Sequence, residues 1–373
     1  MRRFLTAAYV LFVAGIALVV LSRPLYNWDI LPYMGLALAF ENPEPITLHA
    51  RTYAAARAEI PPAKFAALTD SMHAFRGKAA RDPFFFREQL RLYAVKPLYV
   101  QAVRLCAAVG IPLTRATVMP SALSYVVLCL LLLVWIARIM PGLSGIVVSG
   151  TLAVLPFLLE AAGSSTPDLL CGLLLLSGTY MLMERERVSM GLALLTGGVL
   201  SRLDAVLFAV AIVGYVAAYR KARRTTCVIW GAAMIAGIAG FMGLERIDPG
   251  RFITFLSSAE LTAGTAGAGL LSGYWVTLTN GLRSLTLSAL APVVFVAVCT
   301  LYIRVSGKPA RRLDPSSVLL LVILAHVFVR FLLHPVVEDR FLIANYLVVA
   351  ILFLKTLVEV LPGRRTGEPP QPA

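Results

Sequence analysis

Residues 118–137 read VMPSALSYVVLCLLLLVWIA, a run without a single charged residue. A helix of about 20 apolar residues is long enough to cross the hydrocarbon core of a bilayer. Comparable runs recur along the whole chain of 373 residues, which is 59% hydrophobic and only 14% charged. Soluble domains carry about 25% charged residues. The sequence therefore predicts an all-α fold, a polytopic bundle of transmembrane helices.

We expect ten spans. Their ranges are 4–21, 118–137, 144–161, 168–183, 189–201, 204–219, 226–244, 284–303, 316–333 and 341–359. The apolar stretch 97–112 contains Arg104, and we place it as a helix lying on the outer face. The first span is expected to be a retained signal anchor, because it is long for a signal peptide and no small-residue cleavage site follows it.

The distribution of basic residues predicts the orientation. The formal net charge is +14, yet Lys and Arg cluster in short segments between the apolar runs. This is the pattern of the positive-inside rule and not that of a nucleic-acid-binding surface. We therefore expect a multi-pass protein of the cytoplasmic (inner) membrane with both termini in the cytoplasm, surrounded by membrane lipids and without a nucleic-acid partner. The five cysteines form no C-x-x-C pair and are interpreted as packing residues.

A long polar loop, residues 22–96, follows the first span on the outer side. Residues 50–59 and 64–75 have helical composition, and Phe84-Phe85-Phe86 precedes a mixture of apolar and charged residues. Such amphipathic helices either lie flat at the lipid headgroups or cap the bundle, and the sequence leaves both readings open. We expect a single transmembrane domain over 1–361 and a disordered Pro- and Gly-rich tail over 362–373.

Asp29 is the first candidate catalytic residue. It follows the first span and lies among Tyr26, Trp28 and Tyr33. A carboxylate in such surroundings is suited to accept a proton from an alcohol. The alternative is an acid that is simply solvated at the membrane interface.

Asp168 is the second candidate acid. It follows Ser164-Ser165-Thr166-Pro167 at the expected outer start of a span. An aspartate here could serve the site, or it could stabilise the helix N-terminus through the helix dipole, with Thr166 as the cap. Two carboxylates on the same side of the membrane favour the functional reading of both.

Two cations at outer positions are candidates for binding phosphate. Lys96 precedes Pro97, and Arg340 follows Asp339. Lysine offers a point charge, whereas arginine can bind two phosphate oxygens at once. The alternatives are snorkelling of Lys96 at the interface and an ion pair of Arg340 with Glu338 or Asp339.

Further polar residues lie deeper in the predicted bundle. Arg202 is a third candidate phosphate ligand, although it could instead pair with Asp204 inside the bundle. His326, within a span, is expected to be a satisfied core residue. His334 and Glu338 are four apart, but the proline between them argues against a helical metal-binding pair, and we predict no metal ligands.

These elements, in this order, resemble those of the GT-C class of integral-membrane glycosyltransferases. That class includes the protein O-mannosyltransferases and the lipid A aminoarabinose transferase. The motifs that carry the resemblance, over roughly residues 1–350, are Asp29, Lys96-Pro97, Ser165-Thr166-Pro167-Asp168, Ser201-Arg202-Leu203-Asp204 and Asp339-Arg340-Phe341-Leu342. Many relatives have two adjacent acids in the first motif, whereas here Asp29 is followed by Ile30.

The resemblance implies transfer of a sugar from a polyprenyl-phosphate-linked donor to a lipid or glycan hydroxyl, on the outer face of the cytoplasmic membrane. Asp29 would be the base, and Lys96, Arg340 and Arg202 would hold the lipid phosphate. Asp168 would orient the acceptor or hold a divalent metal ion, the one possible cofactor. This hypothesis requires that these residues meet at one place.

Three alternatives to an active glycosyltransferase remain open. A lipid-linked glycan flippase or transporter would place charged residues midway along its spans. An O-antigen-type polymerase typically has its large loop later in the chain, whereas the longest loop here is the first. A family member that has lost activity is the third alternative, because Asp29 stands without a second acid.

Overall fold

The computed structural model is all-α throughout the residues that it describes, which are 2–41, 44–70, 72, 74–219, 224–244, 270–285, 288–306, 313–333 and 335–360. The first half of the chain forms α1 (Arg2–Ser22), α2 (Ile30–Leu38), α3 (Pro45–Glu59), α4 (Pro62–Leu68), α5 (Ala74–Arg81), α6 (Pro83–Ala94), α7 (Pro97–Ala108), α8 (Leu113–Ile139), α9 (Leu143–Ala153), α10 (Pro156–Gly163) and α11 (Asp168–Met183). The second half forms α12 (Val188–Ser201), the 3-10 helix η1 (Leu203–Ala205), α13 (Val206–Tyr219), α14 (Arg224–Leu244), α17 (Leu270–Ser284), α18 (Leu290–Ser306), α19 (Pro315–Leu333), the 3-10 helix η4 (Asp339–Leu342) and α20 (Ile343–Val360).

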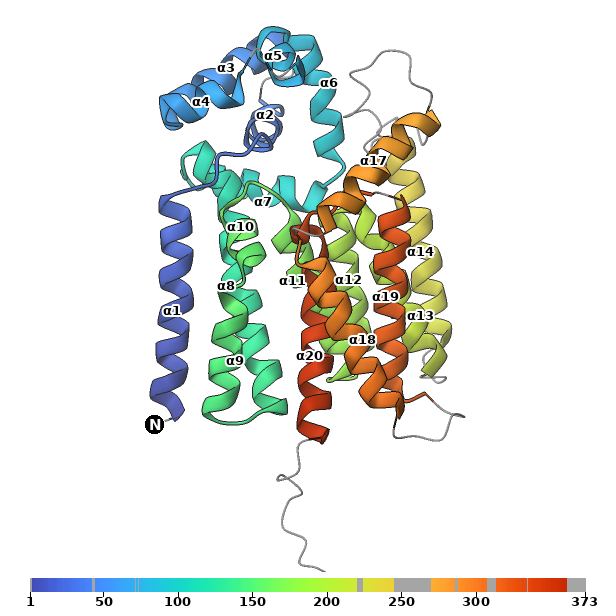
Figure 1. Cartoon of the computed structure of the whole chain (residues 1–373). Coiled ribbons are helices and arrows are strands. Elements are labelled where there is room, and N and C mark those ends of the chain that lie inside the picture. Colours follow the sequence, from blue (N-terminus) through green and yellow to red (C-terminus); the bar gives the residue numbers. More distant parts are fainter. Residues whose placement is uncertain are drawn as a thin grey trace, which may run out of the picture.

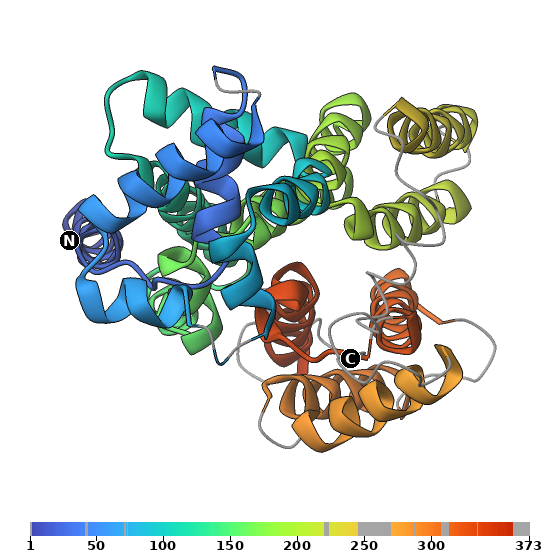
Figure 2. The ribbon, with the colours of Figure 1, turned by 90° about the horizontal axis from the view of Figure 1, so that it is seen from above.

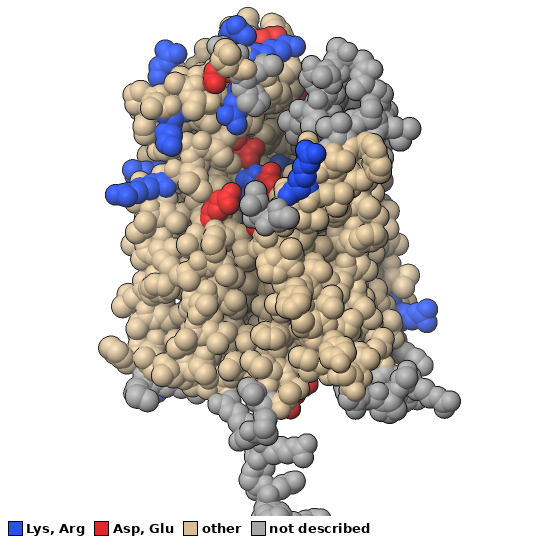
Figure 3. Space-filling view, in the orientation of Figure 1, with Lys and Arg blue, Asp and Glu red and all other residues tan. Residues whose placement is uncertain are grey.

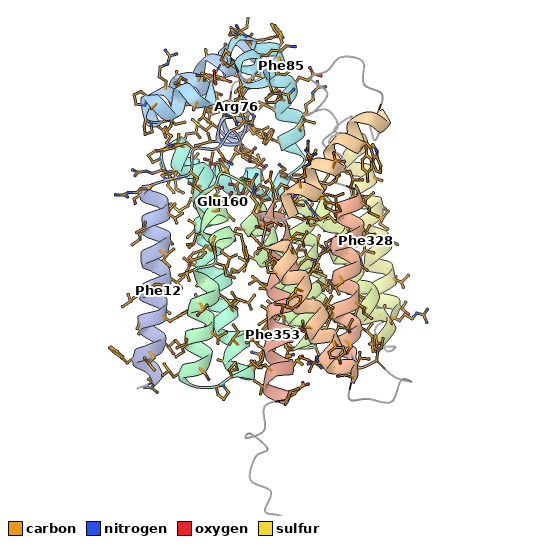
Figure 4. All side chains as sticks on the ribbon, viewed as in Figure 1. Phe12, Arg76, Phe85, Glu160, Phe328 and Phe353 are labelled. Atoms are coloured by element: carbon orange, nitrogen blue, oxygen red, sulfur yellow. The ribbon has the colours of Figure 1, made fainter. Side chains whose placement is uncertain are left out.

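Several helices have the length and composition of membrane spans. In the part of the chain that the structure describes there are four of these, α1, α8, α19 and η4 with α20, or five if the bent pair α9–α10 is one span. Phe12 and Phe328 project from the bundle at mid-height and are 47% and 62% exposed (Figure 4). The lateral surface in Figure 3 carries almost no charge below its upper end. These features indicate a multi-pass membrane protein.

The remaining apolar helices are shorter but run beside the long ones. They are α11, α12, η1 with α13, α14 and α18. Helices α2–α6, which we call the loop helices, stack on one end of the bundle, and α7 lies across its top (Figure 1). We call this the loop end and the other the opposite end. Seen from above, the loop helices cover the half that contains α1 and α8–α10 and leave α14 uncovered (Figure 2).

All ten predicted apolar ranges are largely helical, but one of them is bent and one predicted boundary was wrong. The range 144–161 is not one straight span, because α9 and α10 meet at 57°. The break precedes Pro156, and a residue before proline is disfavoured in the helical conformation. The range 284–303 begins too early, since α18 starts at Leu290.

Helix α17 was not predicted, because residues 245–283 were read as a polar outer segment. It packs against the end of α19, where the Tyr274 hydroxyl donates a hydrogen bond of 2.7 Å to the carbonyl of Leu332. Gly281 is needed for this contact, since a Cβ atom there would lie 2.1 Å from the carbonyl oxygen of Pro335.

The loop helices begin at well-formed caps. The side chain of Glu44 accepts hydrogen bonds from the amides of Ile46 and Thr47 at 3.1 and 2.6 Å. Asp82 accepts from the amides of Phe84 and Phe85 at 3.0 and 3.1 Å. A proline follows each cap, at a position where its missing N–H costs nothing. These caps explain why α3 and α6 begin where they do.

The expected helix at 64–75 is interrupted. Helix α4 ends at Leu68, and α5 begins at Ala74. The Thr69 hydroxyl donates to the Phe65 carbonyl at 3.0 Å, and Asp70 accepts from the Met72 amide at 2.9 Å. Such local side-chain bonds offer the backbone an alternative to the helix.

The loop helices share a hydrophobic core with α7, which joins them to the bundle. Phe86 and Leu90 of α6 are 0% and 2% exposed and belong to one cluster with Tyr33, Met34 and Leu48. Of the two readings of the loop, the structure therefore favours helices that cap the bundle over helices that lie separately on the lipid. The tail 362–373 lies outside the described residues.

Close contact between α11 and α12 holds the centre of the bundle together. A Cβ atom at Gly178 would lie 2.9 Å from Leu195 and 3.0 Å from the backbone carbonyl of Gly191. A Cβ atom at Gly191 would in turn lie 3.1 Å from the carbonyl of Gly178. Small residues at such positions let the backbones of membrane helices approach each other.

We expect Gly178→Ala to destabilise the protein by about 1–3 kcal/mol, because the two backbones must separate. Gly150→Ala is the matched control, since nothing lies within 4 Å of a Cβ atom there. Thermal unfolding in detergent would measure both variants. Equal transition temperatures for the two variants would contradict the close contact.

Candidate functional site

Residues from distant parts of the chain meet at the loop end. The segment after α1 is tied to the end of α10 by a hydrogen bond of 2.8 Å from the Leu25 amide to the Gly163 carbonyl. Asn27 Oδ1 also accepts from the amide of Ser165 at 3.4 Å. These contacts place Asp29 beside Asp168, at the first turn of α11.

Asp168 lies at the centre of the site, with a side chain that is 3% exposed. One carboxylate oxygen forms a close ion pair with Arg202 Nη1, and the other lies 3.5 Å from Arg340 Nε. The predicted cap at Thr166 was wrong. The N-cap is Pro167, and the Thr166 hydroxyl is buried with no hydrogen-bond partner among the described residues.

Arg202 ends α12 and makes two ion pairs. Its backbone is extended, with φ −154°, which turns the chain from α12 into η1. Arg202 donates to Asp204 at 3.0 and 2.7 Å, as predicted for a pair inside the bundle. It also binds Asp168, so the residue joins α12, η1 and α11.

Asp29 is held less tightly and is more accessible. Its side chain is 24% exposed. Asn27 Nδ2 donates to it at 3.1 Å, and the Tyr93 hydroxyl at the end of α6 donates at 2.9 Å. The reading of a freely solvated interfacial acid is therefore wrong, because three other residues contact this carboxylate, Arg340 being the third.

Arg340 bridges the two acids. Its Nη1 lies 4.0 Å from Asp29 Oδ2, and its Nε lies 3.5 Å from Asp168 Oδ2. Its closest partner is Glu338, at 2.6 Å from Nε and 2.5 Å from Nη2. The ion pair with Glu338 that the sequence offered as the alternative is thus present, together with the contacts to both candidate acids.

Lys96 lies beside this network at the start of α7. Its Nζ is 4.9 Å from the ring centroid of Tyr93 and 5.7 Å from that of Tyr33. Within the described part of the chain it makes no ion pair shorter than 4.0 Å. Burial lowers the pKa of Lys96, while the negative charge of Asp29 acts in the opposite direction. The Lys96 ammonium group therefore packs against Tyr93, the same residue whose hydroxyl donates to Asp29.

Arg330 of α19 also belongs to the site, and the sequence analysis missed it. The guanidinium carbons of Arg202, Arg330 and Arg340 lie 4.1, 5.0 and 5.3 Å from the ring centroid of Phe341. Arg330 is 6% exposed, and its Nη2 lies 3.7 Å from Asp204 without a hydrogen-bond partner among the described residues. A lone arginine in an apolar run was the available signal.

A small cavity lies among these arginines. Its volume is about 20 Å³, room for roughly one water molecule. Asp168, Arg202, Arg330 and Arg340 line it, whereas Asp29 and Lys96 lie outside its lining. Figure 3 shows acidic and basic side chains gathered in a hollow below the loop helices. The charged groups thus converge at one place, but they largely fill it with their own ion pairs.

The structure offers little support for a divalent metal ion. No group of three His, Cys, Asp or Glu side chains within the described ranges could hold one. Both carboxylate oxygens of Asp168 already face guanidinium groups. His326 is a satisfied core residue as expected, with Nδ1 2.8 Å from Asn345 Nδ2. His334 lies outside the described residues.

Comparisons with known protein families, with curated proteins and with solved structures find no match to this chain.

We expect Asp168→Ala to lower the free energy of unfolding by about 3–5 kcal/mol, because it breaks a buried ion pair and removes one acidic partner from each of Arg202 and Arg340. Arg202→Ala should have an effect of similar size. The double variant should lose clearly less than the sum, since the residues share one interaction. Additive losses in denaturation experiments would show that Asp168 and Arg202 do not form the pair described.

Proposed function

We propose that this protein is a membrane glycosyltransferase that moves a sugar from a polyprenyl-phosphate-linked donor to a lipid or glycan hydroxyl. The observation that carries the proposal is the meeting of Asp29, Asp168, Arg202, Arg340 and Lys96 at the loop end. These residues come from five separate segments of the chain. The glycosyltransferase hypothesis requires them to lie close together. Carboxylates beside fixed cations are suited to a reaction in which a hydroxyl is deprotonated and a phosphate departs.

The proposed topology has ten spans with the loop end outside the cytoplasmic membrane. The first residues of α1 and the last residues of α20 both lie at the opposite end of the bundle (Figure 1). Arg138 and Arg185 are also found there, close to the ends of α8 and α11. The positive-inside rule then assigns that end to the cytoplasm. The shorter apolar helices are proposed to cross as well, since they run alongside the long ones.

In the proposed reaction, Asp29 accepts the proton of the acceptor hydroxyl. The hydroxyl oxygen attacks the anomeric carbon of the sugar, the bond from that carbon to the phosphate oxygen breaks, and the polyprenyl phosphate leaves with the bonding electrons. Asp29 suits the role of base because it is the more accessible of the two candidate acids. Asp168, between two arginines, suits a role in orienting Arg202 and Arg340.

The arginines supply the positive charge that the leaving phosphate needs. Arg340 is the most readily recruited, since its contacts with Asp29 and Asp168, at 4.0 and 3.5 Å, are longer than those with Glu338. When phosphate takes the place of those carboxylates, Asp29 loses its cationic neighbour and becomes a better base. Arg330, whose Nη2 lies 3.7 Å from Asp204 and makes no hydrogen bond with the described residues, lines the cavity and adds a further donor.

The same geometry bears on the transporter alternative. Arg330 lies three residues before the end of α19, and Arg202 and Asp204 lie at the break between α12 and α13. These buried charges therefore gather at one end of the bundle and not at its midplane, where transporters place their sites. This distribution favours an enzyme acting at one membrane face.

We expect Asp29→Asn to lower kcat by about 10²–10⁴-fold, since the amide cannot accept the proton. The donor can be found by analysing which lipid-linked sugar accumulates in a strain that lacks the protein. Turnover is then measured with purified protein in lipid vesicles. Asp70→Asn is the matched control, an exposed loop acid outside the site. Near-normal turnover by Asp29→Asn would remove the proposed base.

We expect donor binding to weaken at alkaline pH earlier than the ordinary lysine pKa would predict. The ammonium form of Lys96 binds phosphate, and burial lowers the pKa of Lys96, so this charge is lost as pH rises. In Lys96→Arg the charge persists, because a guanidinium group stays protonated. The pH dependence of KM for the donor would therefore lose its alkaline rise in Lys96→Arg. Lys64→Arg, at an exposed position, is the matched control and should keep the alkaline rise of KM. If Lys96→Arg keeps this rise as well, Lys96 does not bind the phosphate.

A further inference from the structure

A second and much larger cavity lies at the opposite end, between α8, α11, α13, α19 and α20. Its volume is about 310 Å³. Ligand-binding pockets in proteins begin at roughly 300 Å³, and well-packed interiors leave few voids larger than a water molecule. Glu184 and Lys355, joined in an ion pair, line it with side chains that are 22% and 29% exposed, which marks the mouth of the cavity.

The walls of this cavity suit a hydrocarbon chain. Aliphatic residues and a methionine form much of its lining, namely Met183, Val216, Leu319, Val348, Ile351 and Leu352. They come from four helices that run alongside one another in the bundle (Figure 1). A chain that entered from the lipid at this end would be enclosed by apolar side chains along its length.

One wall carries a polar group in need of a partner. Trp135 is 3% exposed, lines the cavity, and its indole Nε1 has no hydrogen-bond partner among the described residues. An indole nitrogen can only donate. Buried donors without partners are rare in proteins. The ester carbonyl of a lipid that reached this indole would supply an acceptor.

Basic side chains lie next to that wall. The ring of Tyr180 packs against Trp135 with their centroids 5.1 Å apart. The guanidinium carbons of Arg138 and Arg185 each lie 5.9 Å from the centroid of Tyr180, and both arginines are exposed. Two positive charges thus stand against the ring of Tyr180, one aromatic ring away from the lining residue Trp135.

We propose that this cavity binds one molecule of an anionic phospholipid. One acyl chain fills the apolar interior, an ester carbonyl accepts the hydrogen bond of Trp135 Nε1, and the phosphate lies between Arg138 and Arg185. Basic pockets between membrane helices on the cytoplasmic side are known to select anionic headgroups. The site is separate from the acids and arginines at the loop end, so it stands or falls independently of the proposed reaction.

The test is lipid retention. The full-length protein is placed in nanodiscs of equal parts phosphatidylglycerol and phosphatidylcholine, and native mass spectrometry counts the lipids that remain on the released protein. We expect one retained phosphatidylglycerol. The double variant Arg138→Gln/Arg185→Gln should lose retention about tenfold, and these exposed substitutions should leave the fold intact. Ile351→Phe, which narrows the apolar interior, should weaken retention of either lipid. Arg187→Gln is the matched control, an exposed arginine at the same end.

Several outcomes would overturn the proposal. Equal retention of phosphatidylcholine would show that headgroup charge plays no part. An equal loss in Arg187→Gln would show that general surface charge attracts the lipid. Absence of any retained lipid would show that the cavity does not hold one. Stronger retention by a chain that ends at Val360 would assign the cavity to residues 361–373.

Discussion

The clamp on Asp168 is the interaction on which the loop end depends. A carboxylate that is 3% exposed is costly to bury unless cations pair with it. Here Arg202 arrives from the end of α12 and Arg340 from η4, so one side chain fixes the positions of three segments. Arg340 then extends the network to Asp29. Since each arginine has a second acidic partner, no charge in the group stands alone, and the cluster can persist at the edge of an apolar bundle.

Charged side chains can be buried at the loop end because the helices that carry them begin, end or break there. Proline before α11 starts the helix at Asp168, and the extended backbone of Arg202 separates α12 from η1. Irregular backbone at membrane depth is tolerated where it faces protein or a polar cavity. The loop helices complete this environment from above, with Tyr93 of α6 donating to Asp29. Tyr93 also packs against the hydrophobic core that the loop helices share with α7, which helps to position its hydroxyl.

Local sequence predicts the apolar helices and most of the candidate site residues, but not helix α17 or the role of Arg330. Apolar patterning predicts the positions of the apolar helices well, because it depends on each segment alone, and four or five of the described helices are also long enough to span a membrane. The candidate residues Asp29, Asp168, Arg202 and Arg340 were found from their places at span ends. Tertiary contacts decide what the sequence left undetermined. Helix α17 is fixed by its contact with the end of α19, and Arg330 matters only because Asp204 lies opposite it.

The charge balance of the site also affects how well it would stabilise the departing phosphate in the proposed reaction. Four acids, Asp29, Asp168, Asp204 and Glu338, face four cations, three arginines and Lys96. A polyprenyl-phosphate donor is a phosphodiester with one negative charge, whereas the departing monoester gains a second as the sugar bond breaks. Fixed cations that have exchanged their carboxylate partners for the phosphate stabilise the departing state more than the bound donor. The contacts of Arg340 with Asp29 and Asp168 are longer than its contacts with Glu338, so in the proposed reaction Arg340 is the cation best placed to stabilise the departing phosphate while Glu338 holds the guanidinium group in position.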